Sequence, residues 1–487
     1  MLTSSGFLPY HEPSIVTILI YSSFFLLLNV TNYLFNFLCC GLIGQILIGV
    51  AFGSPGAGWL SRDDQTTITN IGYLGLIFMV YEGGLSTELA SLRSNAYLSS
   101  LVALIGVTVP IALSFLLCDF ANASKLQAFA AGAALCSTSL GTTFTTLRTS
   151  GLAQSRLGVI LINAAMLDDV VGLIMVQIIS SLDPAMPNIS PATIIRPIGV
   201  SLAFIVVTPA ACILVRKSLM SIVSERLSKY TTLAQFKVCA QSLTLLAFVA
   251  GSSYAGTSNL FAAYIAGIII TWFDDSKELD DPQQSASDGT ASQPNRSTQV
   301  LPTHHTGLGI YNDYFDDAVT RILKPCFFAS IGFSIPLTDM FAAEVLWRGC
   351  IYAVLMVFGK LLCGLVLIRF NISPVSSSEQ PINSPLQQKQ YSHHSLYPAV
   401  ILGSAMVARG EIGLLISSVA ESEAIFGTAG RSNTSQLFLI VTWGILICTI
   451  AGPLVIGLLV RRVRRLQTLE RNQVSGRQDP LGIWGFQ

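Results

Sequence analysis

Two adjacent carboxylates, Asp168 and Asp169, stand in the middle of a long apolar stretch that runs from about residue 158 to residue 180. A stretch this long and this apolar is typical of a membrane-spanning helix. A charged side chain at the centre of a bilayer costs at least about 2.5–3.5 kcal/mol, so a helix that served packing alone would not carry two of them. Successive helical residues point about 100° apart, so one carboxylate can face a water-filled cavity while the other faces a neighbouring helix. The aspartate pair is therefore a candidate site for an ion or a proton.

A lysine lies equally deep in another apolar stretch. Lys360 is central in VLMVFGKLLCGLV, too far from either end to reach the membrane surface easily. The alternative is a lysine near a helix end whose ammonium extends to the interface. A buried ammonium needs an anion and a buried carboxylate needs a cation, so we expect Lys360 to pair with one of the two aspartates.

A dense polar cluster precedes the aspartate-bearing stretch, in ALCSTSLGTTFTTL. Its members are Thr138, Ser139, Gly141, Thr142 and Thr143. Hydroxyls and freed backbone carbonyls can bind a small cation where a membrane helix is interrupted. Close packing of small residues is the competing explanation. The density of the cluster favours a role in an ion pathway.

A second interrupted stretch, GSAMVARGEIGLL, carries Arg409, Gly410 and Glu411. On a continuous helix, an arginine and a glutamate two positions apart point to opposite sides. If Gly410 breaks the helix, both side chains can serve one local network beside the ion pathway. A charge pair that only stabilises the broken backbone explains the pattern equally well. Glu82 ends an earlier apolar stretch just before two glycines, and we expect it at the membrane interface.

The composition places the chain in a membrane. Of its 487 residues, 52% are hydrophobic and only 11% are charged, whereas soluble proteins carry about 25% charged residues. The net charge is zero, so no nucleic acid partner is expected. The ten cysteines show no metal-type spacing, and no GxxxxGK[ST] nucleotide motif occurs. We therefore expect an all-α polytopic membrane protein that is not an enzyme and needs no cofactor.

Thirteen apolar spans can be counted along the chain, and their order fixes a topology. They begin near residues 15, 37, 71, 97, 126, 158, 197, 238, 259, 322, 346, 396 and 437. Lysine and arginine gather after the seventh and the thirteenth spans, which places both segments in the cytoplasm, with the N-terminus outside. Residues 1–465 are predicted to form one membrane domain and 466–487 a short cytoplasmic tail. Polar segments 274–320 and 371–395 are predicted to be disordered cytoplasmic loops.

The two interrupted spans also suggest an internal symmetry. They are the fifth and the twelfth in the count, so they would cross the membrane in opposite directions. Interrupted helices at corresponding positions of two inverted repeats indicate the binding site of a secondary transporter.

Several ordered motifs together resemble the monovalent cation/proton antiporter superfamily, over about residues 14–460. They are GLIGQILIGVAFGSP, NIGYLGLIFMVYEGGLSTEL, GTTFTTL, LDDVVGL, FGK and ARGEIGLL. The sequence is most similar to the branch of the sodium/hydrogen exchanger family that holds paired-aspartate and potassium-efflux antiporters. The cytoplasmic inserts, together with the N-x-S/T sequons at Asn122, Asn188 and Asn433 on the predicted outer face, suggest a eukaryotic member such as a fungal one.

This resemblance implies a fold of two inverted repeats with two crossing broken helices, a mobile core domain, and a dimerisation domain that forms a homodimer in membrane lipid. It implies that Asp169 binds the cation and that Asp168 pairs with Lys360. Na⁺ or K⁺ would then exchange for H⁺ by alternating access. A plasma membrane location is expected, with vacuole or endosome as alternatives.

Three other functions make different demands on the residues. An intramembrane aspartyl protease needs two aspartates on different helices that share a proton, which adjacent residues cannot do. A cation channel needs a continuous pore lined by carbonyls or charge rings, and a lysine buried against the aspartate pair argues against such a pore. A sodium-coupled symporter of organic solutes with the same fold remains a further alternative.

Overall fold

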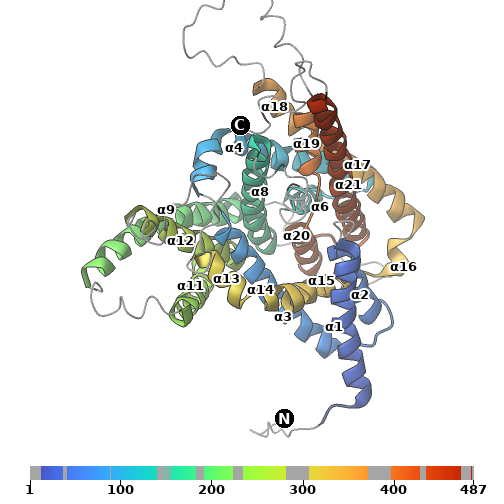
Figure 1. The fold of residues 1–487 in the computed structure, drawn as a ribbon. Helices are drawn as coiled ribbons and strands as arrows, with labels where there is room; N and C mark the ends of the chain where they lie inside the picture. The colour runs from blue at the N-terminus through green and yellow to red at the C-terminus, as the bar shows by residue number, and fades with distance from the viewer. Residues whose placement is uncertain are drawn as a thin grey trace, which may run out of the picture.

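The computed structural model of this protein describes residues 12–36, 41–87, 89–139, 147, 152, 155–182, 191–222, 234–280, 306–370, 396–427, 435–472 and 484. Apart from turns and short connections, these residues are helical, and no strand occurs among them. Figure 1 shows the helices gathered into one body, with α9, α11 and α12 to one side and α1 and α2 on the other. The all-α class predicted from the composition is confirmed.

The helices have the following bounds, in chain order: α1 Ile15–Asn36, α2 Gly41–Phe52, α3 Arg62–Leu85, α4 Leu89–Ser114, α5 Leu117–Phe120, α6 Lys125–Ala134, α8 Arg156–Ser180, α9 Pro191–Ile222, α11 Ala234–Ala255, α12 Asn259–Asp280, α13 Gly307–Tyr314, α14 Asp316–Ala318, the π-helix η2 Val319–Leu323, α15 Lys324–Phe333, α16 Leu337–Met340, α17 Ala343–Leu361, α18 Gly364–Phe370, α19 Tyr397–Ala405, α20 Glu411–Ser422 and α21 Gln436–Asn472.

Eight segments in the described part of the chain are long and apolar enough to cross a membrane. They are Ile15–Leu34, Arg62–Leu85, Leu89–Phe120, Arg156–Ser180, Ile195–Ile213, Gln235–Ala255, Ala343–Ile368 and Gln436–Val463, and Gly41–Phe52 and Asn259–Asp274 are shorter apolar helices. An integral membrane protein follows from these helices. The count of thirteen spans stays a prediction.

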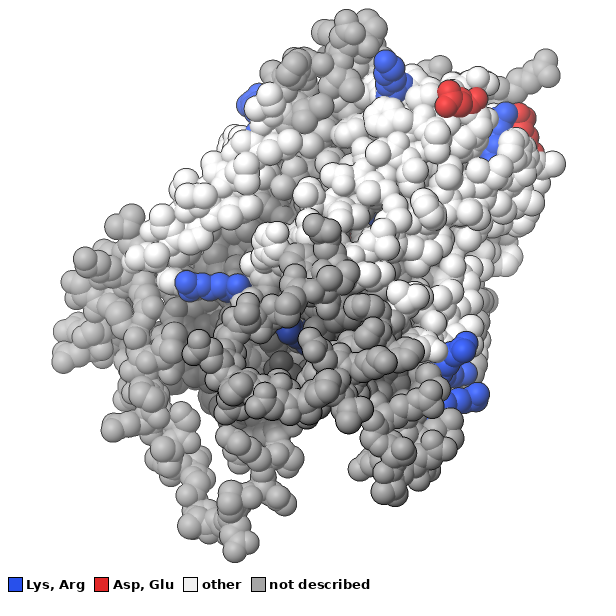
Figure 2. Space-filling view, turned by 90° about the horizontal axis from the view of Figure 1, so that it is seen from above, with Lys and Arg blue, Asp and Glu red and all other residues white. Residues whose placement is uncertain are grey.

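The outer surface fits a lipid environment. Large apolar side chains on α1, α9 and α11 are exposed, among them Leu19, Val206 and Leu243. In Figure 2 the described surface is mostly uncharged, and the few Lys, Arg, Asp and Glu side chains lie mainly toward its margins. Apolar side chains can stay exposed only where lipid or protein covers them.

In the described residues, a helix ends at each of the two places where the sequence predicted an interruption. Helix α6 ends at Ala134 and residues 135–139 are not helical, while α19 ends at Ala405 and α20 begins after Gly410. The two interruptions lie side by side, because the backbone N–H of Ser139 donates to the carbonyl of Ala408 over 2.9 Å. A Cβ on Gly410 would lie 2.7 Å from the Cβ of Ser139, so glycine is needed where the two backbones meet.

Both ends of the polar segment 274–320 are helical, contrary to the predicted disorder, and residues 281–305 lie outside the described part of the chain. Helix α12 continues to Asp280, and α13, α14 and η2 occupy residues 307–323. Thr306 caps α13 by accepting a hydrogen bond from the N–H of Gly309, and Tyr311 and Val319 are buried. The prediction gave too much weight to the polar composition and missed these widely spaced apolar side chains. Residues 371–395 lie outside the described part of the chain.

The first residues of the predicted tail, 466–472, are helical. Helix α21 runs on to Asn472. Further along, Trp484 is 4% exposed, and the guanidinium of Arg156 lies 5.3 Å from its ring centre. Trp484 belongs to an apolar cluster that also contains Leu157 of α8 and Val463 of α21. Part of the tail therefore packs against the start of the helix that carries the aspartate pair.

Candidate functional site

The site is built on α8, which begins with a side-chain cap. Ser155 accepts a hydrogen bond from the N–H of Gly158 over 3.1 Å, which satisfies one of the free donors of the first turn. The helix then runs unbroken to Ser180, so Asp168 and Asp169 lie in its middle and point in different directions. In the structure α8 packs against α4 and α20.

Asp168 faces the inside of the protein and forms the predicted pair with Lys360 of α17. The ammonium Nζ lies 2.6 Å from Asp168 Oδ2, and neither side chain is exposed. Thr138 completes a triangle, because its hydroxyl donates to Asp168 Oδ2 over 2.8 Å and accepts from Lys360 Nζ over 2.9 Å. A buried ion pair is stable only when hydrogen bonds compensate for its lost hydration, and Thr138 supplies one.

Asp169 faces a different neighbourhood and is half-buried. The hydroxyl of Ser137 donates to Asp169 Oδ1 over 3.0 Å. Ser137 belongs to the polar run CSTS at the interruption after α6, yet sequence reasoning began the cluster at Thr138 and missed it. Neighbouring residues of the interruption thus serve different carboxylates, with Thr138 at Asp168 and Ser137 at Asp169.

A third carboxylate, Glu411, lies near Asp169. It opens helix α20, and its charge acts electrostatically on Asp169 and on Glu82. The start of α20 approaches α8 closely: a Cβ on Gly172, one turn after Asp169, would meet Ile412 at 2.9 Å. Glu411 therefore adds negative charge to the side of α8 that Asp169 occupies.

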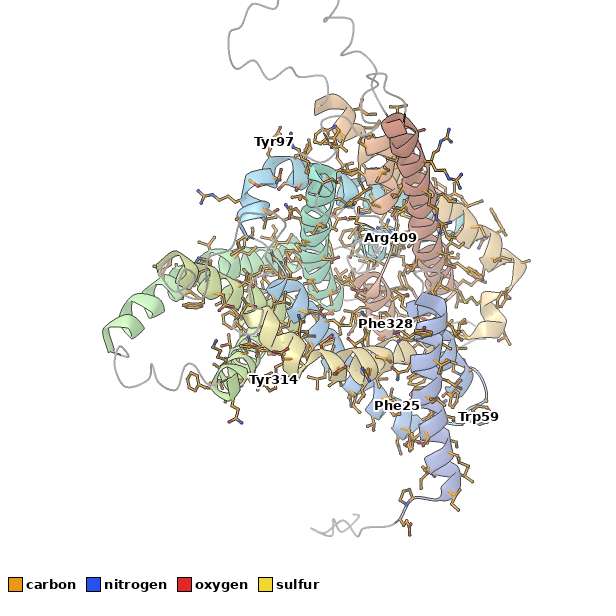
Figure 3. All side chains as sticks on the ribbon, in the orientation of Figure 1. Phe25, Trp59, Tyr97, Tyr314, Phe328 and Arg409 are labelled. Carbon is orange, nitrogen blue, oxygen red and sulfur yellow. The ribbon has the colours of Figure 1, made fainter. Side chains whose placement is uncertain are left out.

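Arg409 holds the two interruptions together. Its Nη1 donates to the carbonyl oxygens of Ser137 over 2.7 Å and Cys136 over 3.3 Å, both in the non-helical segment that follows α6. The side chain is 0% exposed, and Figure 3 places it in the interior of the protein. The hydroxyl of Thr449 donates to the carbonyl of Arg409 over 3.0 Å. Of the two predicted roles, these contacts support stabilisation of the broken backbone.

The remaining predicted residues have the following places. Ser139 and Gly410 face each other where the interruptions meet. Gly141, Thr142 and Thr143 lie outside the described residues. Glu82 is half-buried in the last turn of α3, and the hydroxyl of Tyr311 approaches one of its oxygens at 3.5 Å.

The ligands near Asp169 suit a small hard cation. Carboxylate and hydroxyl oxygens are the donors that such ions prefer. Within the described part of the chain, no group of three or more His, Cys, Asp or Glu side chains could hold a metal ion. This arrangement can reversibly bind either a proton or a cation at the Asp169 carboxylate. The cation would lose part of its hydration shell when it binds.

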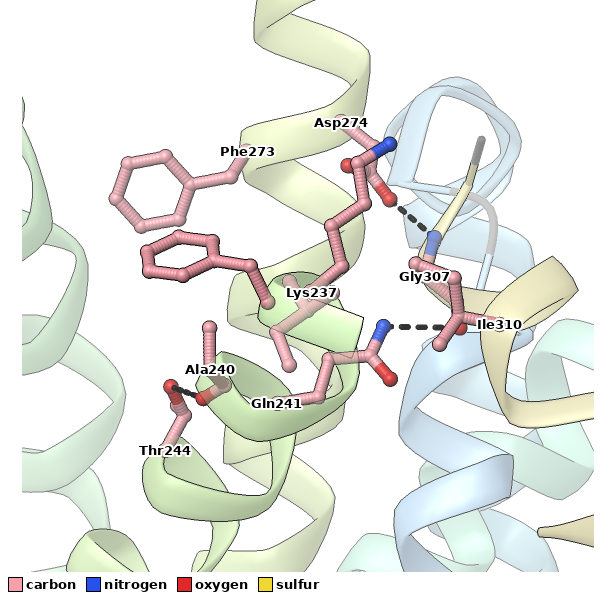
Figure 4. Close-up of a pocket in the computed structure, with 10 residues that line it drawn as sticks. Lys237, Ala240, Gln241, Thr244, Phe273, Asp274, Gly307 and Ile310 are labelled. Carbon is pink, nitrogen blue, oxygen red and sulfur yellow. Dashed lines mark hydrogen bonds between the residues drawn. The ribbon is translucent and has the colours of Figure 1, made fainter. Parts of the chain in front are cut away.

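A cavity of about 190 Å³ lies elsewhere, between α11, α12 and the start of α13 (Figure 4). Asp274 accepts a hydrogen bond from the N–H of Gly307 over 2.5 Å, and Gln241 donates to the Gly307 carbonyl over 3.0 Å. These bonds fasten the beginning of α13. Neither aspartate of α8 lines this cavity.

The chain is similar to known antiporters over most of its length. It is 34% identical over 143 residues to a high-affinity Na⁺/H⁺ antiporter, NhaS3, of Synechocystis, a match that spans 29% of this chain and 31% of that protein. Identity is 22% over 79% of this chain and 82% of the Na⁺/H⁺-K⁺ antiporter GerN of Bacillus cereus. Identity is 20% over 87% of this chain and 92% of a Na⁺/H⁺ antiporter of Enterococcus hirae.

The fold is that of a solved sodium/proton antiporter. The structure of MjNhaP1 from Methanocaldococcus jannaschii matches with a TM-score of 0.62 at 14% identity, over 92% of this chain and 99% of that chain. The sequence profile of the transmembrane sodium/hydrogen exchangers matches residues 39–462. The resemblance inferred from the motifs is thereby confirmed, and neither the symporter nor the channel alternative is favoured. With its fold and most of its length matched, this protein belongs to the sodium/hydrogen exchanger family of cation/proton antiporters, which are transporters and not enzymes.

Proposed function

We propose that Asp169 is the residue at which a monovalent cation and protons compete during antiport. One observation carries this assignment: Asp168 is already paired with Lys360 and fully buried, whereas Asp169 is half-buried and receives one hydroxyl hydrogen bond, from Ser137. Among the described residues, no basic side chain forms an ion pair with Asp169. Asp169 is thus the carboxylate that can take a new positive partner.

The exchange follows from the chemistry of one carboxylate. Only the ionised form of Asp169 attracts a cation, so cation binding and proton binding exclude each other. The Ser137 hydroxyl oxygen provides a second ligand, and the negative charge of Glu411 raises the local concentration of cations. A proton arriving from the other side of the membrane then displaces the cation.

Alternating access requires that the site move as a unit. The hydrogen bond between Ser139 and Ala408 and the bonds from Arg409 to the carbonyls of Cys136 and Ser137 join the two interruptions. Helices α6, α8 and α20 pack against one another. We propose that these elements shift together and expose Asp169 to each side in turn.

The Lys360–Asp168 pair is proposed to set the charge balance of transport. If Lys360 releases a proton when Asp168 changes partner, two protons move for each cation and transport is electrogenic. The full burial of both groups supports this role, because an uncompensated charge at this position would be costly.

The proposed substrate is Na⁺, with K⁺ as the alternative to test. This choice rests on the names of the relatives. NhaS3 and the Enterococcus protein are named Na⁺/H⁺ antiporters, and the name of GerN also includes K⁺. We further propose a homodimer in the plasma membrane, with vacuole or endosome as alternatives, and a cytoplasmic C-terminus. The clusters of Lys and Arg after the seventh and last predicted spans support that orientation.

The test is proton flux in proteoliposomes that contain the full chain, against a panel of Li⁺, Na⁺ and K⁺. Asp169→Asn is expected to abolish cation-dependent proton movement and to leave the protein monodisperse in detergent. Asp317→Asn is the matched control, because its carboxylate is 87% exposed on α14. Near-normal exchange by Asp169→Asn would show that Asp169 is not the residue that binds the cation and the proton. Sodium-dependent uptake of an organic anion without proton counterflow would establish symport instead.

A further inference from the structure

A glycine of α4 borders the buried ion pair. Gly106 is buried on the face of α4 that packs against α8 and α17, together with Val102, Ala103 and Pro110. Glycine is a poor helix former in the middle of a helix, so its presence at this depth calls for a steric reason.

The neighbours of Gly106 supply that reason. A Cβ at this position would lie 3.1 Å from Lys360 Nζ, 3.2 Å from Asp168 Oδ2 and 3.4 Å from Asp168 Oδ1. Non-bonded atoms usually stay about 3.5–4.0 Å apart. A single methyl group would therefore press on both members of the pair at once.

The pair cannot yield freely to that pressure. Nζ is held by Asp168 over 2.6 Å and by Thr138 over 2.9 Å, and all three side chains are 0% exposed. Moving the ammonium away from α4 lengthens at least one of these hydrogen bonds. Arg409 and Asp169 are the other charged groups near the pair, and in the described structure neither forms an ion pair with Lys360 or Asp168.

We propose that Gly106 is a positioning residue for transport: its missing side chain lets α4 close over the pair while Lys360 keeps both Asp168 and Thr138. This inference rests on the proposed role of the pair in moving protons. Gly106 acts through Lys360 and touches neither cation nor proton itself.

Two other glycines provide matched controls. A Cβ on Gly359, directly before Lys360, would meet Leu113 Cδ1 at 3.0 Å and Val109 Cγ1 at 3.5 Å, both of them apolar side-chain atoms of α4. Gly359→Ala therefore disturbs the packing of α4 on α17 without touching the charges. A Cβ on Gly457 of α21 meets nothing within 4 Å.

The experiment compares Gly106→Ala, Gly359→Ala and Gly457→Ala in proteoliposomes. Gly106→Ala is expected to lower the exchange rate about tenfold, the effect of weakening one charge-assisted hydrogen bond, and to shift the pH dependence of the rate. Gly359→Ala should change the melting temperature but not the pH dependence, and Gly457→Ala should change neither. A wild-type pH dependence and rate in Gly106→Ala would overturn the proposal.

A second variant separates steric pressure on the pair from general misfolding. Gln is shorter than Lys by one atom, so Lys360→Gln leaves space where Nζ stood. In that background Gly106→Ala should cost little further thermal stability, even if Gly106→Ala alone fails to fold. Gly106→Ala that costs as much stability in the Lys360→Gln background as in the wild type, with Lys360→Gln alone as the reference for the double variant, would mean that Gly106 serves backbone packing only. This melting measurement does not depend on transport activity. Its result therefore tests Gly106 even if Asp169 proves not to be the ion carrier.

Discussion

Replacing Lys360 by Met is expected to destabilise the protein strongly, because it leaves Asp168 as an unpaired charge in the interior. The Met side chain keeps most of the volume of Lys, so the loss reports charge and not an empty space. Asp168→Asn leaves the ammonium unpaired in the same way. Replacing both residues removes both charges, and the double variant should recover much of the loss.

The magnitude follows from the contacts. Lys360→Met removes the donors to Asp168 Oδ2 at 2.6 Å and to Thr138 at 2.9 Å, and leaves Asp168 with one hydrogen bond, from Thr138. Asp168 Oδ1 has no hydrogen-bond partner among the described residues. Removing one partner of a buried ion pair costs about 3–5 kcal/mol. We expect a coupling free energy of at least about 2 kcal/mol between the two sites.

The assay is the free energy of unfolding of the purified protein in mixed micelles, for the wild type, both single variants and the double variant. The exposed pair of Arg321 and Asp317, 3.1 Å apart with side chains 73% and 87% exposed, is the matched control. Exposed pairs four residues apart on a helix contribute about 0.3–0.5 kcal/mol, so a cycle on this pair should show almost no coupling.

The sign of the pH dependence gives a second check. In Lys360→Met, uptake of a proton by Asp168 removes the unpaired charge, so the loss of stability should be smaller at acid than at alkaline pH. Additive destabilisation by the two single variants, at every pH, would refute the reasoning. Lys360 would then be stabilised by another partner, and the electrogenic part of the proposed mechanism would lose its support.

Two further predictions concern the ion ligands and the topology. Ser137→Ala should weaken the apparent affinity for the cation about fivefold without unfolding the protein, since it removes one ligand and one hydrogen bond worth about 1 kcal/mol. Ser422→Ala is the control and should leave the affinity unchanged, because the Ser422 hydroxyl donates to the carbonyl of Ser418 in its own helix. An epitope inserted within residues 285–300 should react with antibody only in permeabilised cells, and labelling of intact cells would contradict the predicted orientation.

The sequence alone determined the helix that carries the site. The length and apolarity of the stretch around Asp168 and Asp169 require a membrane helix, and the cost of burying charge there requires a function. The interruption at Gly410 could also be predicted from the sequence, because glycine between two charged residues disfavours a continuous apolar helix. The length of the apolar stretch, its composition and the position of the glycine are local properties, so the order of residues along the chain is enough to predict them.

Sequence reasoning on the residues left open which aspartate pairs with Lys360, and the family resemblance assigned Asp168. The tertiary structure decides this, because the rotation of α8 about its axis depends on its packing against α4 and α20. The same rotation brings Ser137 to Asp169, although nothing in the run of hydroxyl residues distinguishes it from its neighbours.

Only the tertiary structure shows the contacts between distant parts of the chain. Arg409 meets the carbonyls of Cys136 and Ser137 across separations of 273 and 272 residues. In the sequence, Gly106 does not differ from other small residues of an apolar helix. Its place beside Lys360 follows only from the packing of α4 in the tertiary structure. Periodicity records which face of a helix is apolar, but it contains no information about which distant helix will cover that face or how closely the two backbones will approach.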